Sequence, residues 1–428
     1  MKEETLKLLD SAKARQLMGK LYGENGVDAN LARYRDLVEK FVKEFGDKDM
    51  MMFSSPGRTE ISGNHTDHNH GKVLAGSINL DCAGAAAKNG TDTVNIISET
   101  FNQKFSVDLT DLAPSSRKAG TVDLVKGLLK GFQEKGYRTG GFDAYITSNV
   151  ISAAGVSSSA AFEMLLCSMV NTFFNDDKVD VVTYAHIGKY AENEYWDKSS
   201  GLLDQMACAV GGLITIDFYN PQDPAVEQIP FDFGSQGHSL IIVNTGKGHA
   251  DLSADYSSVP GEMKKVAEYF GKEVLAQVKE EDVIADLNRV REYAGDRSVM
   301  RALHFFEENR RVEAEVAALK ENRFDDFLKG ITASGNSSWK WLQNCYTTAN
   351  VQEQGISVAL ALTELFIADK GRGACRIHGG GFAGVIMAML PNDLVDEYTD
   401  YIEKALGQGS AYKMSIRPYG SICLNQKM

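Results

Sequence analysis

The sequence predicts an α+β protein of two domains. Strand-like and helix-like segments mix along its 428 residues without the strict strand, helix, strand rhythm of a parallel α/β sheet. A chain of this length accommodates about two or three domains. The stretch NPQDPA, residues 220–225, is rich in turn-forming residues and has no apolar periodicity, so it is the expected linker. We therefore expect an N-terminal domain over residues 1–225 and a C-terminal domain over residues 226–428.

Composition excludes several classes of protein. A formal net charge of −13 opposes nonspecific nucleic-acid binding, which requires a basic surface. Six cysteines occur without any CxxC pair, so neither a zinc site nor a disulfide framework is indicated. The N-terminus is charged and amphipathic, and no apolar run reaches the length of a membrane span. We expect a cytoplasmic monomer that binds neither nucleic acid nor a membrane.

Apolar periodicity predicts the elements of the N-terminal half. Helical spacing over residues 4–46 is interrupted by a turn at Gly23–Gly26, which divides it into two pieces. The elements expected after it are strands at 50–54, 93–97 and 104–109, a helix at 122–135 and a strand at 142–150.

The stretch from Pro56 to Asp81 (PGRTEISGNHTDHNHGKVLAGSINLD) predicts a loop that lines a small polar ligand. Its carboxylate, amide and imidazole groups supply donors and acceptors together, which suits a ligand with many hydroxyl groups, such as a sugar. A metal site is less favoured, because the histidines lack the i, i+4 spacing or added cysteines of known metal motifs. The side chains concerned are Arg58, Glu60, Asn64, His65, Asp67, His68, Asn69 and His70.

The stretch from Val150 to Glu163 (VISAAGVSSSAAFE) is a candidate phosphate site. Gly155 permits a tight turn, and Ser157–Ser159 are suitable N-caps for an apolar helix over Ala160–Val170. The first turn of a helix offers unpaired N–H groups and the positive end of its dipole to an anion. By itself the pattern favours an ordinary serine-capped helix, and other stretches are needed to decide.

An acidic residue downstream has the surroundings of a general base. Asp204 follows Gly201 and lies among the apolar residues Leu202, Leu203 and Met206. Burial among such neighbours would make its protonation matter for catalysis. A helix-capping or surface aspartate fits the same residues equally well.

The C-terminal half ends in a glycine-rich motif. It should open with a strand at Ser239–Asn244 and continue with charged helices between Glu262 and Lys329. Residues 375–390 (CRIHGGGFAGVIMAML) then place three glycines ahead of an apolar strand. Three glycines allow the backbone to approach another group closely. A turn alone rarely needs three.

Three of these stretches together resemble a known family. PGRTEISGNHTDHNHGKV, GVSSSAA and HGGGFAG resemble, in order and spacing, the signature motifs of the GHMP small-molecule kinases, and the first resembles that of galactokinases. The resemblance runs nearly end to end and includes GLLDQMA at 201–207, ADY at 254–256 and SWKWL at 338–342. It implies an N-terminal domain like the second domain of ribosomal protein S5, a ferredoxin-like C-terminal domain, and an active site between them. The implied reaction is phosphorylation of the C1 hydroxyl of galactose with magnesium ATP.

The resemblance implies a role for each matching residue. Asp204 would take or orient the proton of the anomeric hydroxyl, and Arg58 would stabilise the transferring phosphoryl group. Ser158, with Ser157 or Ser159, and Glu192 would hold Mg²⁺. The implied sugar contacts are Asn64, His65, Asp67, Gly201 and Tyr256. The implied nucleotide contacts are Gly155, Ser157, Ser158, Ser159 and Gly380, the last within the third motif, Gly379–Gly381.

The chain departs from the galactokinase pattern at the implied sugar site. Where galactokinases usually read GEHTDY, it reads GNHTDH, so Asn64 replaces the glutamate that contacts the C6 hydroxyl. Two unit charges about 4 Å apart near a protein surface interact by about 4 kcal/mol, enough for a glutamate to exclude a C6 carboxylate. Galacturonate, or another galacto-configured sugar, is therefore the alternative to galactose. An anion would be favoured if three basic side chains pointed inward, namely His68, His70 and Lys247.

Other departures concern the nucleotide. The second motif has Ile151 and Ala153 in place of its usual proline and a glycine, and the tryptophan that helps to hold adenine is absent from residues 121–125. The third motif reads Ile377 and His378 where methionine and threonine are common, and the sequence does not reveal the role of His378.

A third hypothesis is a galactokinase-like sensor that binds sugar and nucleotide without turnover. Such a sensor should have lost catalytic residues. The sequence retains Arg58, Glu192, Asp204 and the Ser159–Ala160 pair, which favours an enzyme.

Overall fold

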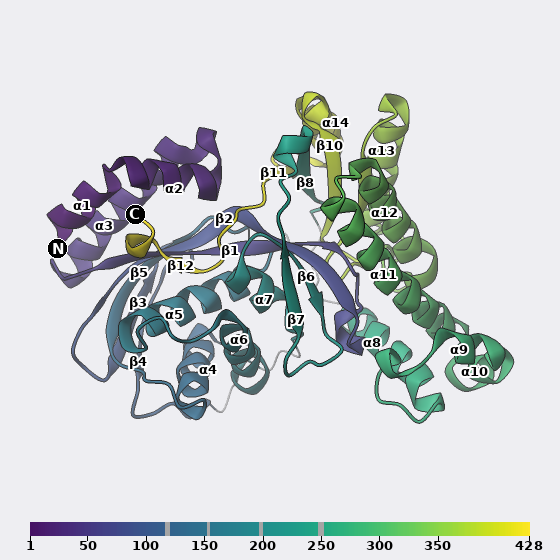
Figure 1. Ribbon diagram of the computed structural model, residues 1–428, viewed down its shortest axis with the longest axis horizontal. Helices are drawn as coiled ribbons and strands as arrows, with labels where there is room; N and C mark the ends of the chain where they lie inside the picture. Colours follow the sequence, from purple (N-terminus) through teal and green to yellow (C-terminus); the bar gives the residue numbers. More distant parts are fainter. Residues whose placement is uncertain (116–119, 152–154, 197–199, 247–251) are drawn as a thin grey trace.

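The computed structural model describes residues 1–115, 120–151, 155–196, 200–246 and 252–428. Two β-sheets meet near the middle of the molecule, and helices cover both (Figure 1). Both chain ends lie at the same side of the larger sheet. Ala153 and Lys247, which the sequence analysis singled out, lie outside the described residues.

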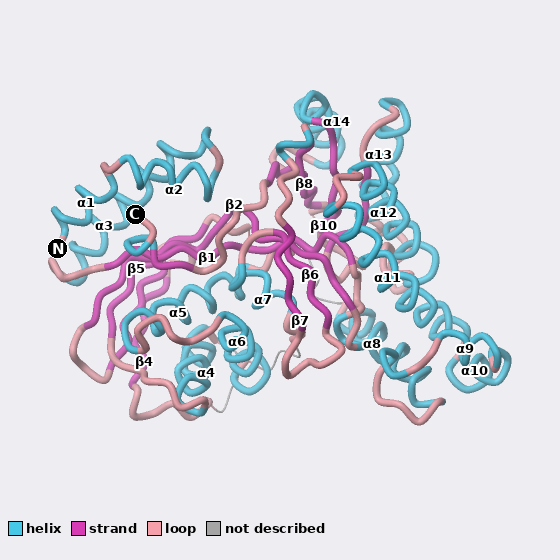
Figure 2. The backbone as a smooth tube through the Cα atoms, viewed as in Figure 1, coloured by secondary structure: helices cyan, strands magenta, loops and turns pink. Residues whose placement is uncertain are grey.

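The larger sheet has eight strands, and its centre is a long hairpin. The strand order is β12-β1-β2-β5-β3-β4, with β6 beside β2 and β7 beside β6 (Figure 2). All pairings are antiparallel except that of β3 with β5. The strands are β1 (Met51–Ser62), β2 (Lys72–Lys88), β3 (Thr93–Ser98), β4 (Gln103–Asp108), β5 (Phe142–Ser148), β6 (Leu213–Asp217), β7 (Ala225–Ile229) and β12 (Ile422–Cys423).

Helices lie on both faces of this sheet (Figure 1). Alternate residues of β2 point to opposite faces, as a strand requires: Ala83 and Ala85 pack with the N-terminal helices, whereas Cys82 and Ala86 belong to the core that includes α5. One layer comprises α1 (Lys2–Leu9), α2 (Ala12–Tyr22) and α3 (Val27–Phe45). The other comprises α4 (Thr121–Glu134), α5 (Ser158–Phe174), α6 (Val181–Tyr195) and α7 (Leu203–Val210).

The smaller sheet is antiparallel, with the order β11-β8-β10-β9. Ile241 and Val243 of β8 pack against α13 and α14, whereas Leu240 and Ile242 join the large core shared with the first sheet. Its strands are β8 (His238–Asn244), β9 (Ala374–His378), β10 (Val385–Pro391) and β11 (Ala411–Met414). The helices of this half are α8 (Ser253–Tyr269), α9 (Glu280–Ala285), α10 (Leu287–Ala294), α11 (Asp296–Lys320), α12 (Phe324–Ser337), α13 (Gly355–Lys370) and α14 (Val395–Leu406).

The predicted strand pair at 93–97 and 104–109 and the helix at 122–135 are confirmed. The predicted loop at 56–81 is wrong for most of its length, because β1 continues to Ser62 and β2 begins at Lys72. The ladder pairs Arg58 with Ser77 and Glu60 with Ala75, and register shifts on either side absorb the irregular sequence. Only residues 63–71 form a loop.

The predicted linker at 220–225 is the connection of a hairpin. β7 follows it directly and pairs with β6 from Ala225 to Ile229, so the first sheet extends beyond residue 225. The second sheet begins with β8, and β12 returns the C-terminus to the first sheet beside β1. A turn-rich stretch signals a change of direction, which a hairpin and a linker share. The division into domains at residue 225 stays a prediction.

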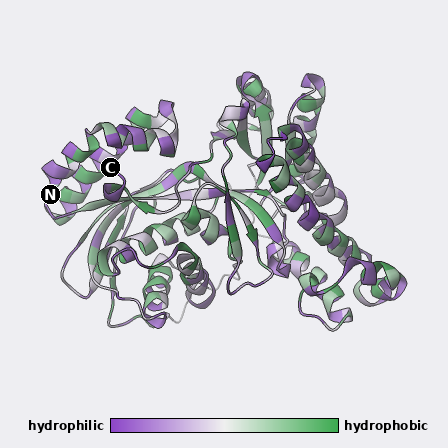
Figure 3. Cartoon of the chain, in the orientation of Figure 1, coloured by the Kyte–Doolittle hydropathy of each residue, from purple (hydrophilic) through white to green (hydrophobic). Residues whose placement is uncertain are grey.

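Hydropathy follows this layered arrangement. The helices carry both hydrophilic and hydrophobic residues, as expected of elements packed on one face (Figure 3). Within the described ranges, no helix is long and apolar enough to span a bilayer.

Helix α11 places an unusual carboxyl group in the core. Glu315 is 1% exposed, and neither of its carboxylate oxygens has a partner at good hydrogen-bond geometry among the described residues, although the Ser62 hydroxyl lies close enough to oppose the rise in its pKa. Burial raises the pKa of Glu315 to about 8, and the nearby Glu308 carboxylate adds to this shift. The folded protein therefore holds a proton on Glu315 that the unfolded chain, with an ordinary value of 4.5, releases.

We predict that Glu315→Gln changes how stability depends on pH. Because the folded pKa lies above the unfolded one, the contribution of this group to stability is lost as pH rises through about 8. The loss builds up between the unfolded pKa of 4.5 and the folded pKa of about 8, so between pH 6 and pH 9 the parent should lose about 3 kcal/mol more than Glu315→Gln. Urea unfolding at both pH values measures this, with the exposed Glu321→Gln as control. Equal losses in parent and Glu315→Gln would contradict the prediction.

Candidate active site

A polar cavity of about 210 Å³ lies where the two sheets meet. Residues from β1, the loop 63–71, α6, α7 and the glycine turn after β9 line it, so segments far apart in the sequence build the cavity. Four carboxylates and one arginine are among its lining residues. The lining comprises Arg58, Glu60, Asn64, His65, Asp67, His68, Glu192, Ser200, Gly201, Leu203, Asp204, Gln205, Gly379 and Gly380.

An arginine and an aspartate form the charged centre of the cavity. The Nε and Nη2 atoms of Arg58 on β1 lie 2.8 and 2.7 Å from Oδ1 of Asp204 in the first turn of α7. Ser157 donates a hydrogen bond to Oδ2 of the same carboxylate, and Arg58 donates another to the carbonyl of Gly155. Burial alone would lower the pKa of Arg58, but Asp204 and Glu60 raise it, and the net shift is upward. Arg58 is thus a fixed cation that orients Asp204.

The beginning of α5 differs from the predicted serine cap. Ser157 occupies the N-cap position with φ 58°, and its side chain donates to Asp204 instead of accepting from a backbone N–H. Its hydroxyl therefore leaves the N–H groups of the first turn without a side-chain cap. An uncapped first turn is what an anion site requires.

A second carboxylate lies beside this helix start. Glu192 of α6 is 1% exposed; its Oε1 accepts from Ser159 at 3.2 Å and its Oε2 from Gln205 at 3.0 Å. The hydroxyl that contacts Glu192 is thus that of Ser159, one residue beyond the predicted Ser158. A carboxylate and a hydroxyl side by side fit the oxygen ligands that Mg²⁺ prefers. No cluster of three metal-ligating His, Cys, Asp or Glu side chains occurs in the described part of the chain.

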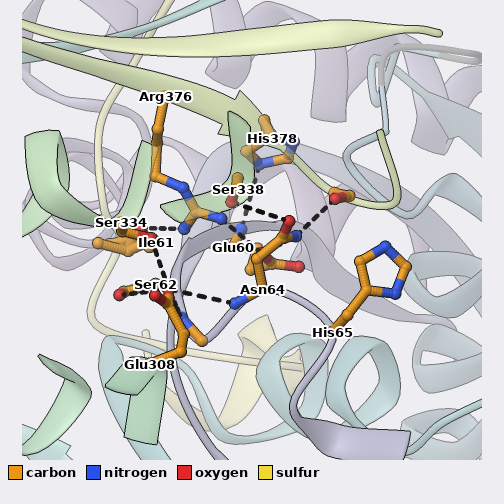
Figure 4. A network of polar contacts seen from close by, with 12 residues as sticks. Glu60, Ile61, Ser62, Asn64, His65, Glu308, Ser334, Ser338, Arg376 and His378 are labelled. Carbon is orange, nitrogen blue, oxygen red and sulfur yellow. Dashed lines mark hydrogen bonds and ion pairs between the residues drawn. The ribbon is translucent and has the colours of Figure 1, made fainter. Parts of the chain in front are cut away.

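Asn64 is held by four protein hydrogen bonds (Figure 4). Its amide nitrogen donates to Oε1 of Glu60 at 2.9 Å and to the carbonyl of Gly379 at 2.7 Å. Its amide oxygen accepts from Asn344 at 2.8 Å and from Ser338 at 3.3 Å. The side chain is 0% exposed and its two donors and two acceptor sites are all used. It therefore has no polar site left for a sugar hydroxyl.

The strand β9 is anchored to β1 by Arg376. This residue is 0% exposed; Nη1 donates to the carbonyl of Ile61 at 2.6 Å and Nη2 to Oε1 of Glu60 at 3.1 Å. Burial raises the pKa of Glu60, and the charges of Arg376 and Arg58 oppose that rise. The ion pair therefore joins the two sheets beneath the cavity.

His378 makes a second bridge from β9 to β1. Its Nε2 accepts from the backbone N–H of Glu60 at 3.1 Å and lies 3.0 Å from Oγ1 of Thr59, so the proton of this ring is on Nδ1. Burial lowers the pKa of His378 well below its ordinary value, and Arg58 and Arg376 add to this. A neutral imidazole thus connects the sheets between two arginines, which gives His378 the role that its sequence position left open.

The loop 63–71 and the glycine turn face each other across the cavity. Nε2 of His65 donates to the carbonyl of Gly380 at 2.8 Å, and burial lowers the pKa of His65 to about 4, so the ring is neutral at pH 7. A Cβ on Gly381 would lie 2.3 Å from the carbonyl oxygen of Asn344, so no larger residue fits there. Tyr256 donates to the carbonyl of Gly381 at 2.7 Å.

Glu308 fixes the other side of the same loop. It accepts from the backbone N–H of Gly63 at 3.1 Å and from the hydroxyl of Ser334. Burial alone would raise the pKa of Glu308, but His304, Arg311 and Arg376 bring it to about 2. Sequence reasoning missed this residue, because a glutamate on a charged helix resembles any solvated one.

Asp67 and Gly201 are close neighbours in the cavity wall. A Cβ on Gly201 would lie 2.5 Å from Oδ2 of Asp67, so a side chain here would displace that carboxylate. His68 also lines the cavity, with Nε2 3.9 Å from Oδ1 of Asp67. His70 instead borders a separate surface hollow beside α11.

The cavity brings together most of the residues that the sequence singled out, namely Arg58, Asn64, His65, Asp67, Glu192, Gly201, Asp204 and Gly380. Five others lie around it without lining it, namely Gly155, Ser157, Ser158, Ser159 and Tyr256. Residues missed from the sequence are His304, Glu308, Asn344 and Arg376, all buried and all in contact with residues 60–65 or the glycine turn.

Comparisons with known proteins agree with this geometry. Residues 39–88 match the galactokinase galactose-binding signature, and residues 123–212 match the GHMP kinase N-terminal domain. A galactokinase of Clostridium perfringens strain SM101 is 31% identical, covering 89% of this chain and 95% of the relative. The chain belongs to the galactokinase family.

Other relatives agree with the assignment to this family. A galactokinase of Clostridium tetani is 28% identical, over 90% of this chain and 95% of its own. The crystal structure of Lactococcus lactis galactokinase complexed with galactose superimposes with a TM-score of 0.77 at 25% identity, over 91% of this chain and 100% of that one. A mevalonate kinase from Methanococcus jannaschii shares the fold, with a TM-score of 0.59 at 15% identity over 86% and 98% of the chains. The predicted GHMP kinase fold is thereby confirmed.

We predict that Asp204→Asn folds normally and loses turnover. The amide keeps the size of the side chain and loses the charge that pairs with Arg58 and accepts a proton, so kcat should fall by about 10²- to 10⁴-fold. A coupled assay of ADP release measures this, with circular dichroism as the folding check and the exposed Asp223→Asn as control. Turnover within a few-fold of the parent would remove Asp204 from the chemistry.

Proposed function

We propose that this protein transfers the γ-phosphoryl group of ATP to the anomeric hydroxyl of galactose and forms galactose 1-phosphate. The observation that carries the proposal is the Arg58–Asp204 pair at the centre of a polar, sugar-sized cavity in a galactokinase-family chain. A non-catalytic sensor has no need of a carboxylate oriented by three donors.

In the proposed mechanism the two charged residues divide the work. Asp204 accepts or orients the proton of the anomeric hydroxyl, because its carboxylate faces the cavity and Arg58 and Ser157 fix its position. Arg58 also supplies positive charge beside the transferring phosphoryl group, where electrostatic stabilisation contributes most to such reactions.

The nucleotide phosphates are proposed to lie at the beginning of α5. The first-turn N–H groups that follow Ser157, together with Gly155, Ser158 and Ser159, form the polar edge nearest to Asp204. Glu192 with Ser159 or Ser158 would hold Mg²⁺, which neutralises phosphate charge when bound. Gly380 lines the same cavity as Glu192.

The charge of the cavity favours a neutral sugar. Its carboxylates are Glu60, Asp67, Glu192 and Asp204, against the single cation Arg58 among the described lining residues. A sugar with a C6 carboxylate would add another negative charge. His70 does not line the cavity, so it cannot contact an anionic group of a sugar bound there. Galactose is therefore proposed over galacturonate.

The surroundings of the enzyme are also proposed. All six cysteines are free and buried, and a reducing cytoplasm keeps such thiols reduced. We also propose that the working form is a monomer.

We predict that Glu192→Gln raises the magnesium requirement. Loss of the carboxylate removes one charged oxygen ligand, so the Mg²⁺ concentration for half-maximal rate at fixed ATP should rise about tenfold. The exposed Glu194→Gln, two residues further along α6, is the matched control. An unchanged Mg²⁺ dependence in Glu192→Gln would exclude Glu192 from the metal site.

The proposed substrate is tested with a panel of sugars. Values of kcat/KM for galactose, galacturonate, N-acetylgalactosamine, glucose and arabinose at fixed magnesium ATP should be highest for galactose. Asp67 in the cavity wall is expected to favour the galacto over the gluco configuration. Preference for glucose, or for galacturonate over galactose, would overturn the proposed function.

A further inference from the structure

We propose that Glu60 is the specificity-determining carboxylate of the sugar pocket, accepting a hydrogen bond from the C6 hydroxyl and repelling sugars with a C6 carboxylate. The proposal rests on the galactose kinase activity proposed above. It gives Glu60 the role that galactokinases assign to a glutamate at position 64.

Asn64 cannot take that role. Its four hydrogen-bonding positions are occupied by Glu60, Gly379, Ser338 and Asn344, and the residue is fully buried. A sugar hydroxyl could reach it only by breaking one of these bonds, which would leave a buried group unpaired at a cost of about 1–3 kcal/mol. The asparagine therefore holds the wall of the pocket and leaves recognition to a neighbour.

Glu60, in contrast, has a free oxygen at the cavity. Both hydrogen bonds described for its carboxylate, from Asn64 at 2.9 Å and Arg376 at 3.1 Å, go to Oε1. Among the described residues none donates to Oε2, and this oxygen is not enclosed as a buried atom without a partner would be. Glu60 lines the cavity, so Oε2 is available to a ligand.

The spacing along β1 also places Glu60 within reach of the sugar. Arg58 and Glu60 both line the cavity, and the ladder with β2 is continuous between them. Two residues of a strand span about 7 Å. In a pyranose, C6 is attached to C5, across the ring oxygen from C1, so a sugar whose anomeric hydroxyl lies at Arg58 and Asp204 can direct its C6 hydroxyl along the strand towards Glu60.

The neighbours of Glu60 hold its carboxylate in one position. Arg376 and Asn64 hold Oε1 from two sides, and His378 fixes the backbone of Glu60 through its N–H. A carboxylate fixed in this way can discriminate, because it cannot turn away from a repelled ligand. The Glu60–Asn64 pair also suggests a test, since exchanging the two residues would move the charge and keep a carboxylate–amide pair.

The test measures kcat/KM for galactose, 6-deoxygalactose and galacturonate in the parent, Glu60→Gln, Glu60→Asn, Asn64→Glu and the exchange variant Glu60→Asn/Asn64→Glu. The parent should prefer galactose over 6-deoxygalactose by tenfold or more, about what one hydrogen bond to a fixed charge provides. In Glu60→Gln that preference should fall to about threefold, and the ratio of galacturonate to galactose activity should rise about tenfold or more. The buried Glu315→Gln, outside the cavity, is the control and should keep the preferences of the parent.

The exchange variant guards against a folding defect. Glu60→Asn removes a buried charge beside Arg376, and Asn64→Glu adds one. The exchange restores the original number of charges, so the double variant should recover galactose activity to within about threefold of the parent value. Parent-like preferences in Glu60→Gln, or equal use of galactose and 6-deoxygalactose by the parent, would overturn the proposal. A parent that does not phosphorylate galactose would instead refute the proposed function.

Discussion

The arrangement of the active site depends on one buried ion pair, that of Arg376 with Glu60. Arg376 comes from β9 of the smaller sheet, and it also donates to the carbonyl of Ile61 on β1 of the larger sheet. Removing one partner of a buried ion pair costs about 3–5 kcal/mol, because the other charge is left uncompensated. The glycine turn 379–381 follows β9 directly, so the same pair also sets the distance between that turn and the loop 63–71.

The walls of the cavity are therefore held by hydrogen bonds where the sugar is proposed to bind. His65 and Asn64 reach across to the carbonyls of Gly380 and Gly379, and Glu308 holds the backbone of Gly63 from α11. The proposed nucleotide side is built differently, because Arg58 and Asp204 lie beside a start of α5 that has no side-chain cap. A fixed wall for the proposed sugar and an uncapped helix start for the proposed phosphates suit a kinase that must select its acceptor and exchange nucleotide.

Much of the fold was predictable because apolar periodicity is a local property. The β3–β4 pair and α4 follow from alternating and helical spacing. The extension of β1 through PGRTEIS was not predictable from the sequence. Those polar residues form a strand only when β2 supplies the ladder partners of Arg58 and Glu60. The sequence could not show that the stretch 220–225 connects a hairpin for the same reason, because the pairing of β7 with β6 is not encoded in the turn residues themselves.

The sequence by itself determined the class of chemistry. It contains three motifs with the residues of a sugar kinase, among them Arg58, Glu192 and Asp204, and the identity and order of these residues can be read directly from the chain. Tertiary structure decided which side chain faces the ligand. It turned Ser157 from a helix cap into a donor to Asp204, and it enclosed Asn64 so fully that Glu60 carries the free oxygen. The physical reason is that burial and hydrogen-bond partners arise between segments hundreds of residues apart, such as Glu60 and Arg376.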